Sequence, residues 1–194
     1  MKTQKIKILV LPIILALLFF SCSKSNEEVS SSVNQLQING VLNNNNQDLQ
    51  RITYNMLTSE DKLNLWRQKL ENCISDENLN DEQRELVLEL KTILIRDYFE
   101  EVSNDNKEYF KNIYVVDYLE RIQVAFTREQ INSIFYRLYG NSLEFEDKKC
   151  DCNLGSIFGC GASDDCKAKT CTSIVSGCGF LWAWDCDGLC RLYL

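Results

Sequence analysis

The sequence predicts an all-α helical bundle followed by a small disulfide-rich module with little regular structure beyond a short β-hairpin. Apolar residues recur at helical spacing between residues 48 and 147, which is typical of amphipathic helices. The only proline is Pro12, so no proline interrupts those helices. Eight of the ten cysteines and six of the eight glycines fall after residue 149, where apolar runs are short. Such a short segment cannot fold by hydrophobic burial alone, and it needs cross-links.

Residues 1–21 are predicted to be an export signal. A basic start with Lys2, Lys5 and Lys7 precedes an apolar run over residues 8–20, and the small residue Ser21 follows. This order is typical of a secretory signal peptide. The apolar run is too short to span a bilayer as a helix.

Cys22 follows the export signal directly and is predicted to carry a lipid. The stretch Leu18-Phe19-Phe20-Ser21-Cys22 resembles a bacterial lipobox, in which the cysteine is acylated and becomes the first residue of the mature chain. We therefore expect a lipoprotein that is attached to a membrane through its N-terminal lipid, at the outer membrane or the cell surface. The alternative is a plain signal peptide with Cys22 left free.

Residues 22–47 are predicted to be a flexible tether. Ser, Asn, Gln and Glu dominate the segment, and residues 43–46 are a run of asparagines. Little of this composition packs into a core. The regular element that we expect here is one short strand around residues 36–41.

Residues 48–147 are predicted to be a helical domain of four to five helices packed as a bundle. Thr58, Asn80 and Thr127 each stand where a polar side chain caps the start of a helix. Gly140 stands where the last helix ends. The apolar stripes expected in the core are Leu49, Ile52 and Met56; Leu63, Trp66, Leu70 and Cys73; Leu86, Val87, Leu90, Ile93 and Leu94; Phe110, Ile113, Val116, Leu119 and Ile122; and Ile131, Ile134, Phe135 and Leu138.

Cys73 lies on one of these stripes, outside the C-terminal cluster of cysteines. We interpret it as a buried free thiol that packs as a small apolar group. The alternative is a reactive thiol or one that pairs with another molecule.

Residues 148–194 are predicted to be the disulfide-rich module. The export signal places the chain in an oxidising compartment, where clustered cysteines form disulfides. Eight cysteines allow 105 pairings, and the sequence does not choose among them. The alternative is a zinc site built on Cys150-Asp151-Cys152, which requires reduced thiolates. The eight cysteines are Cys150, Cys152, Cys160, Cys166, Cys171, Cys178, Cys186 and Cys190.

Two further features of the module carry functional expectations. Lys148 and Lys149 stand just before the first cysteine and are a candidate site of proteolytic processing. Phe180, Trp182 and Trp184 belong to the apolar run of the module and are candidate binding residues. This aromatic run predicts a short strand that packs over a disulfide or faces a partner.

Composition excludes several classes of function. The chain has no histidine, which excludes Ser–His and Cys–His nucleophilic sites and metal sites that contain histidine. It also has no Cys-x-x-Cys motif of the kind that redox enzymes use. Its net charge is -7, and loss of the three lysines in the export signal makes the chain more acidic, which disfavours nucleic acid as a partner. We predict a protein that is not an enzyme and that needs no metal or cofactor.

The chain resembles a known family in two of its segments. The eight-cysteine block opens with Cys-x-Cys and contains Gly177-Cys178-Gly179-x-x-Trp182-x-x-x-Cys186, which looks like fulvocin C, a small disulfide-rich bacteriocin of myxobacteria. The segment Leu57-Thr58-Ser59-Glu60-Asp61-Lys62-x-x-Leu65-Trp66 is similar to the helical part of the bacteriocin fulvocin C-related proteins of Bacteroidetes. The resemblance implies an antagonistic role for the module, with the helical part as its carrier or pro-region.

The sequence therefore supports two readings of function. In the first, the chain is an exported lipoprotein whose C-terminal module is released from, or acts from, the cell surface against other bacteria, through a target that the sequence does not identify. In the second, it is a surface binding module that presents Trp182 and Trp184 to a protein or a glycan. An enzyme is a third reading, which the composition disfavours.

Overall fold

The computed structural model describes residues 35–44, 46–76, 78–138, 150–155, 158, 160, 166–168 and 171–190. The chain divides into two compact units, Met1–Leu36 and Gln37–Leu194, and of the first only residues 35 and 36 are described. The predicted export signal, Cys22, Gly140, Lys148 and Lys149 all lie outside the described residues. Among the helices that are described, none is both long enough and apolar enough to cross a membrane.

The end of the predicted tether is helical, which corrects the sequence-based expectation. Residues 37–42 form a helix in which Ile38, Val41 and Leu42 are buried. These three residues are spaced three and one apart, so a helix places them on one face, whereas a strand would divide them between two. The expected strand around residues 36–41 is therefore wrong, and the packed part of the chain begins earlier than predicted.

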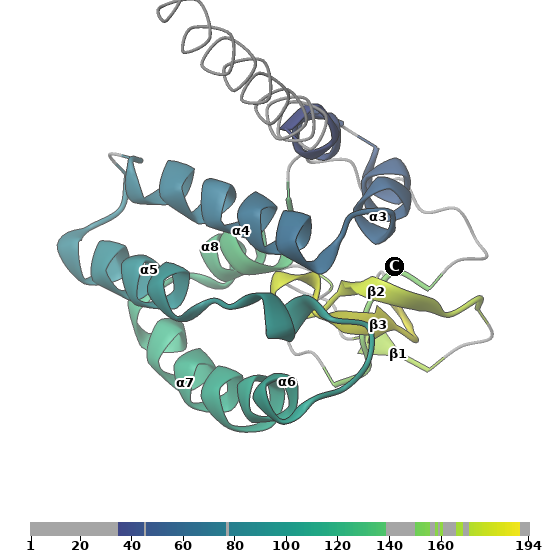
Figure 1. The fold of residues 1–194 in the computed structure, drawn as a ribbon. Helices are drawn as coiled ribbons and strands as arrows, with labels where there is room; N and C mark the ends of the chain where they lie inside the picture. The colour runs from purple at the N-terminus through teal and green to yellow at the C-terminus, as the bar shows by residue number, and fades with distance from the viewer. Residues whose placement is uncertain are drawn as a thin grey trace, which may run out of the picture. The chain divides into compact units, whose positions relative to one another are not determined.

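Helices dominate the described residues between 37 and 138, as predicted (Figure 1). We call residues 37–138 the helical region. After the helix over residues 37–42, its elements are α3 (Gln47–Asn55), α4 (Ser59–Ile74), α5 (Asp81–Ile93), the 3-10 helix η1 (Arg96–Phe99), α6 (Asp105–Tyr109), the π-helix η2 (Phe110–Tyr114), α7 (Val115–Ala125), α8 (Arg128–Ile131) and the π-helix η3 (Asn132–Tyr136).

The three predicted caps are confirmed. The Thr58 side chain accepts a hydrogen bond from the backbone N–H of Asp61 at 3.1 Å. Asn80 and Thr127 each form a capping box, in which the glutamine three residues later bonds back to the cap. Each cap satisfies backbone donors that the first turn of a helix leaves unpaired.

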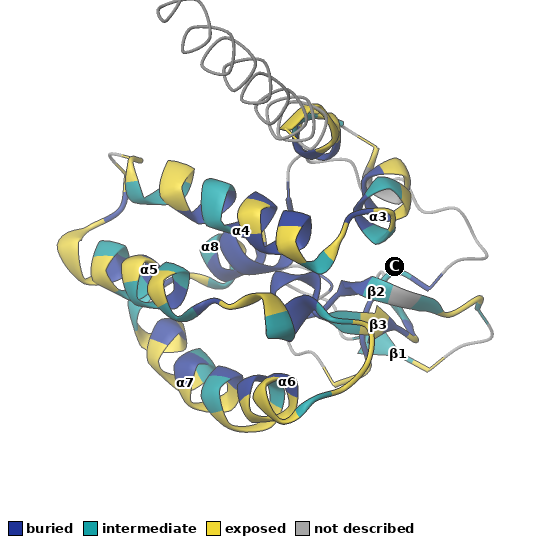
Figure 2. Ribbon diagram, viewed as in Figure 1, coloured by how far each residue is buried: buried dark blue, intermediate teal, exposed yellow. Residues whose placement is uncertain are grey.

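Buried and exposed faces alternate along these helices (Figure 2). Helix α4 buries Leu63, Trp66 and Leu70, as its stripe predicts. The stripe through η2 and α7 is partly wrong, because Ile113 and Val116 are exposed. A π-helical turn at Phe110–Tyr114 adds a residue to the turn and so shifts the buried face of the following helix. The buried residues of this segment are Phe110, Val115, Tyr118 and Ile122.

The remaining described residues, 150–190, form what we call the C-terminal region. Strand β2 (Ile174–Cys178) pairs antiparallel with β3 (Trp184–Cys186), and β1 (Cys166–Lys167) pairs antiparallel with β4 (Leu189–Cys190). The hairpin of β2 and β3 accords with the expected one. The aromatic run was predicted to be a strand, but Phe180–Trp182 is instead the 3-10 turn η4 that joins β2 to β3.

Four disulfides hold the C-terminal region, so the prediction of cross-links by sulfur is confirmed. They join Cys150 to Cys171, Cys152 to Cys166, Cys160 to Cys190, and Cys178 to Cys186. The sequence left this pairing open. All eight partners lie within the described residues, and no bridge between those residues reaches the helical region.

Candidate functional site

The most unusual local feature is the tip of the β2–β3 hairpin, which we call the tip and define as Phe180–Trp182. The disulfide between Cys178 and Cys186 closes the loop that carries it. Leu181 and Trp182 both adopt positive φ angles, of 51° and 54°. Non-glycine residues adopt this left-handed conformation only when their surroundings hold them there, at a cost of about 1–3 kcal/mol each. The tip is therefore a constrained loop rather than an extended strand.

Gly179 precedes the tip and is required by its geometry. Its φ of 69° is also left-handed, and a Cβ atom at this position would lie 3.0 Å from Cβ of Trp184. A larger residue would therefore push the Trp184 side chain away. The Gly-Cys-Gly sequence of the motif provides this close approach.

Trp182 is fixed in the core of the helical region. Its ring is 1% exposed and makes edge contacts with Tyr54 and Trp66, at centroid distances of 5.2 and 6.4 Å. Its indole N–H donates a hydrogen bond to the backbone carbonyl of Tyr136 at 2.8 Å. A buried tryptophan whose N–H has found a partner contributes strongly to packing and fixes orientation as well.

Phe180 occupies a second position in the same core. It is 2% exposed, stacks on Phe135 at a centroid distance of 5.4 Å, and makes edge contacts with Tyr118 and Tyr136 at 5.8 Å each. The tip thus enters a set of aromatic side chains that come from four helices. We call this set the cradle and define it as Tyr54, Trp66, Tyr118, Phe135 and Tyr136.

Phe180 and Trp182, two of the candidate binding residues, are therefore buried against the helical region. The helical region covers both side chains. Removing their apolar area from water is favourable, and this favours the buried position. Trp184 differs from them. It is half-buried, and the Lys111 ammonium lies 5.1 Å from the centre of its ring. Of the three predicted binding residues, only Trp184 keeps an accessible face.

A second contact joins α3 to β2 through polar groups. The Arg51 guanidinium donates hydrogen bonds to the carbonyls of Gly177, at 3.2 Å, and Asp151, at 2.6 Å. Asn55 donates to the carbonyl of Ser176 at 3.2 Å and accepts from the Ser176 hydroxyl. The guanidinium also lies 5.8 Å from the ring centre of Trp182. These bonds join α3 to three backbone carbonyls of the C-terminal region.

The sequence did not reveal Arg51 and Asn55 as contact residues. The stripe Leu49, Ile52 and Met56 was expected in the core, but these residues are 50%, 49% and 78% exposed. Helix α3 turns its opposite face inward, with Arg51 and Tyr54 buried. The carbonyls that Arg51 and Asn55 bind are 100 or more positions away in the chain, so no local pattern carries the signal.

A small, partly open cavity lies beside the tip. It has a volume of about 10 Å³, close to the space that one water molecule needs, and Tyr54, Lys62, Lys107 and Trp182 are among the residues that line it. The Tyr54 hydroxyl is buried without a hydrogen bond of ordinary geometry to any described residue. Burial raises the pKa of Tyr54 and lowers the pKa values of Lys62 and Lys107.

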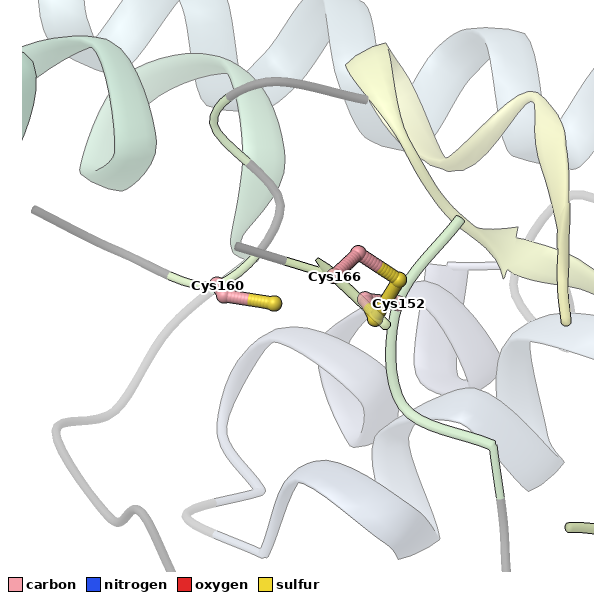
Figure 3. A group of neighbouring side chains, drawn as sticks. All are labelled: Cys152, Cys160 and Cys166. Carbon is pink, nitrogen blue, oxygen red and sulfur yellow. A yellow bond between two sulfur atoms is a disulfide. The ribbon is translucent and has the colours of Figure 1, made fainter. Parts of the chain in front are cut away.

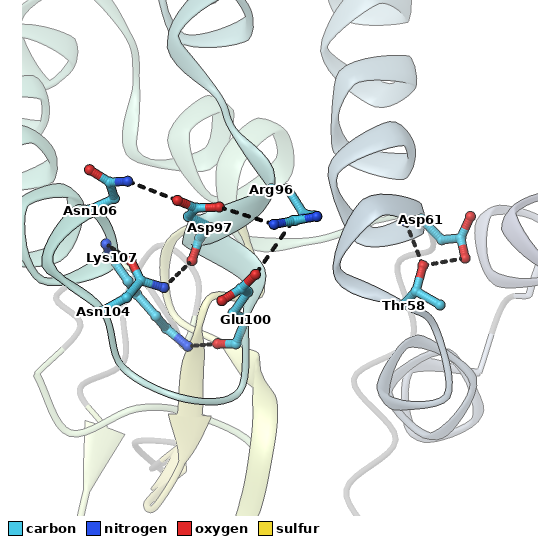
Figure 4. A network of polar contacts seen from close by, with 8 residues as sticks. All are labelled: Thr58, Asp61, Arg96, Asp97, Glu100, Asn104, Asn106 and Lys107. Carbon is cyan, nitrogen blue, oxygen red and sulfur yellow. Dashed lines mark hydrogen bonds and ion pairs between the residues drawn. The ribbon is translucent and has the colours of Figure 1, made fainter.

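Polar contacts around η1 and α6 support this side of the cavity (Figure 4). Asn104 caps α6 by accepting from the backbone N–H of Lys107 at 2.9 Å, and it donates to the carbonyl of Asp97 at 3.1 Å. The Lys107 ammonium donates to the carbonyl of Glu100. The Glu100 carboxylate is paired with Arg96 at 3.4 Å. The carbonyl and the carboxylate of Glu100 therefore both have partners within this network.

Two groups of side chains in the C-terminal region place their potential metal ligands as close together as a metal site requires. Ligand atoms of Cys152, Cys160 and Cys166 lie within 4.8 Å of one another (Figure 3), as do those of Asp151, Cys152 and Cys190. Zinc binds cysteine as the thiolate. Each of these cysteines is instead in a disulfide, Cys152 with Cys166 and Cys160 with Cys190. The alternative of a zinc site built on Cys150-Asp151-Cys152 therefore does not fit them. Asp151 accepts a hydrogen bond from the backbone N–H of Cys190 at 2.9 Å, which ties the start of the region to β4.

Cys73 is the free cysteine among the described residues. It is partly buried, and burial raises the pKa of its thiol, which disfavours the reactive thiolate. These observations favour the interpretation as a packed thiol over that of a reactive one.

Comparisons with models of protein families, with curated proteins and with solved structures found no match to this chain.

Proposed function

We propose that the chain is an exported, non-enzymatic carrier of a disulfide-stapled effector related to the fulvocin C-type bacteriocins. The single observation that supports this best is the position of the tip. Trp182, the aromatic residue of the bacteriocin-like motif, and its neighbour Phe180 are both covered by the helical region and lie in the cradle. A carrier or pro-region has this arrangement when it masks the apolar part of an effector until the effector is delivered.

The four disulfides indicate an extracellular or secreted protein, because such bridges persist in oxidising compartments. We propose in addition that Cys22 carries a lipid that attaches the chain to the outer membrane or cell surface. Lys148 and Lys149 are the proposed processing site, and the target is a surface or protein of a neighbouring cell.

The net charge of the C-terminal module limits how the effector can bind its target. Residues 150–194 contain five aspartates against two lysines and one arginine. An acidic module of this kind has no electrostatic attraction to anionic lipid headgroups. Apolar and shape complementarity, rather than positive charge, then provide its affinity.

The test is intact mass spectrometry of producing cells and of their culture medium, before and after reduction, combined with a growth assay on related strains. We expect a lipid mass on the cell-bound chain, two hydrogens gained per bridge on reduction, and a fragment in the medium that inhibits growth. The matched control is Lys148→Gln with Lys149→Gln, which removes the dibasic site and abolishes release. An intact chain that stays on the cell and inhibits no strain contradicts the proposal.

A second candidate is a surface binding module, which the half-buried ring of Trp184 favours. In this case the chain stays on the cell whole and captures a protein or glycan. Trp184→Ala then abolishes capture while the disulfides and the helical content remain as in the wild type. Loss of capture with no released fragment in the medium would favour this candidate over the first.

A further inference from the structure

We propose that the cradle is a binding site for the tip that retains the C-terminal region after the peptide link between Leu138 and Cys150 is cut. The inference rests on the proposed function, since only a processed carrier has this link cut. The cut itself is the hydrolysis of one peptide bond by an endopeptidase. It consumes one water molecule, leaves a carboxylate and an amine, and changes no disulfide.

The first argument is the distribution of covalent bonds. Every bridge between the described residues joins two cysteines of the C-terminal region. Apart from the link between Leu138 and Cys150, these described regions are held together only by noncovalent contacts. The C-terminal region also keeps its own four bridges when the link is cut. It is therefore preorganised for the cradle, and little ordering entropy opposes its retention.

The second argument is the composition of the contact. Tryptophan, tyrosine and arginine contribute most to tight protein interfaces when they are fully desolvated. Trp182 and Phe180 are both nearly inaccessible, and Trp66 and Tyr118 in the cradle are fully buried. The hydrogen bond from Trp182 to the Tyr136 carbonyl adds a directional requirement at the centre of the contact.

The third argument is that a separate polar contact fixes orientation. Arg51 and Asn55 bind the backbone of β2 and the carbonyl of Asp151, and none of these groups belongs to the tip. Asn132 in η3 donates a further hydrogen bond to the Phe158 carbonyl at 2.6 Å. Three places on the helical region thus bind one preorganised region, and cutting the chain at one point leaves all of them intact.

The consequence is that processing and release are separate events. Cleavage yields a noncovalent complex of two chains, and a second event frees the effector. A dithiol reductant provides such an event: it reduces the bridge between Cys178 and Cys186 to two thiols, is itself oxidised to a disulfide, and opens the loop that carries the tip.

The experiment uses the full chain with a recognition sequence for a site-specific endopeptidase inserted between residues 138 and 150. The oxidised protein is cut to completion and examined by size-exclusion chromatography and native mass spectrometry. We expect one peak that contains both fragments in equal amounts, with separation after denaturant or reductant is added. Fragments that elute apart from the oxidised, undenatured protein overturn the inference.

Variants in the cut protein show whether the tip carries the retention. Trp182→Phe and Asn55→Ala are chosen as mild changes, and Leu154→Ala is the matched control at an exposed position of the C-terminal region. We expect Trp182→Phe to raise the dissociation constant of the fragments by about 30-fold or more, Asn55→Ala by about 5-fold, and Leu154→Ala by less than about 2-fold. The uncut variants are first checked for native circular dichroism. If Trp182→Phe folds but leaves the dissociation constant unchanged, the cradle is not the binding site.

The two proposals fail in different ways. Fragments that separate when cut overturn the inference and leave release of an effector in place. Absence of any fragment from the medium of producing cells overturns the proposed function, whereas the complex of the two fragments in vitro remains measurable.

Discussion

The helical region and the C-terminal region reach stability by different routes. In the helical region, caps begin the helices and long apolar stripes bury residues such as Trp66 and Leu70. In the C-terminal region, strands of two to five residues are too short to form a core, and four disulfides hold them in register. Disulfides therefore hold the short strands together, but they do not replace a hydrophobic core for the whole C-terminal region. Its largest buried apolar side chains, Phe180 and Trp182, pack in the core of the helical region instead.

Among the substitutions considered, Trp182→Ala should lower the free energy of unfolding most, because it removes the main contact between the two regions. It empties the centre of the cradle and removes the hydrogen bond from the Trp182 indole to the Tyr136 carbonyl. We expect a loss of about 3–5 kcal/mol in the free energy of unfolding, measured by urea denaturation of the oxidised protein. Trp184→Ala is the control, and its half-buried ring should cost about 1 kcal/mol. Equal losses from the two variants would show that the tip does not pack as described.

Removal of single disulfides sharpens the comparison. The bridge between Cys160 and Cys190 spans 30 residues, whereas that between Cys178 and Cys186 spans 8. If the bridges act by restricting the unfolded chain, the double alanine variant at Cys160 and Cys190 loses about 1 kcal/mol more, within a range of about 2–4 kcal/mol. A larger loss at Cys178 and Cys186 would mean that ordering of the tip, rather than loop length, decides the effect.

The pH dependence of stability tests the core that the two regions share. Burial raises the pKa of Tyr54 and of Tyr118 above the ordinary value of 10.0. In the unfolded chain these hydroxyls ionise near pH 10, whereas in the folded protein they stay neutral. The stability contributed by the neutral form is therefore complete below pH 10 and falls as pH rises above it, by about 1.4 kcal/mol per pH unit for each tyrosine.

The measurement is denaturation between pH 9 and 11, with tyrosinate absorbance recorded in parallel. Tyr54→Phe should halve the alkaline loss that these two residues cause. At pH 7 it should change stability by less than about 1 kcal/mol, because the Tyr54 hydroxyl forms no hydrogen bond of ordinary geometry with a described residue. If the native protein ionises all its tyrosines near pH 10, the described burial is wrong.

The smallest effect is expected at a cap within the helical region. Thr58→Ala removes the hydroxyl that accepts from the Asp61 backbone and donates to its carboxylate (Figure 4). We expect a loss of about 1 kcal/mol by thermal or urea denaturation, and Thr58→Ser should restore most of it. If Thr58→Ala lowers the free energy of unfolding as much as Trp182→Ala does, the contact between the tip and the cradle contributes no more to stability than a single helix cap.

Much of the helical region could be predicted because its signals are local. A cap and the residue three positions later, as at Asn80 and Gln83, meet within one turn whatever the rest of the chain does. Errors arose where distant residues decide which face is buried. Helix α3 shows Leu49, Ile52 and Met56 to solvent because Arg51 and Asn55 bind β2.

The candidate site illustrates the same limit. Phe180, Trp182 and Trp184 were singled out as one aromatic run, yet the turn at Phe180–Trp182 separates their environments. The sequence shows that these rings are apolar and closely spaced. It does not show that positive φ angles at Leu181 and Trp182 direct two of them into the helices and leave the third half-exposed.

By itself, the sequence determined the composition of the two regions, the positions of the caps and the use of sulfur for cross-links. These features depend on residue types and on spacings of a few positions, and the local geometry of a helix or a loop follows from such spacings. Only the tertiary structure decided which cysteines pair, which face of α3 is buried and where the tip lies. These outcomes depend on contacts between residues far apart in the chain, and local spacing carries no information about such contacts.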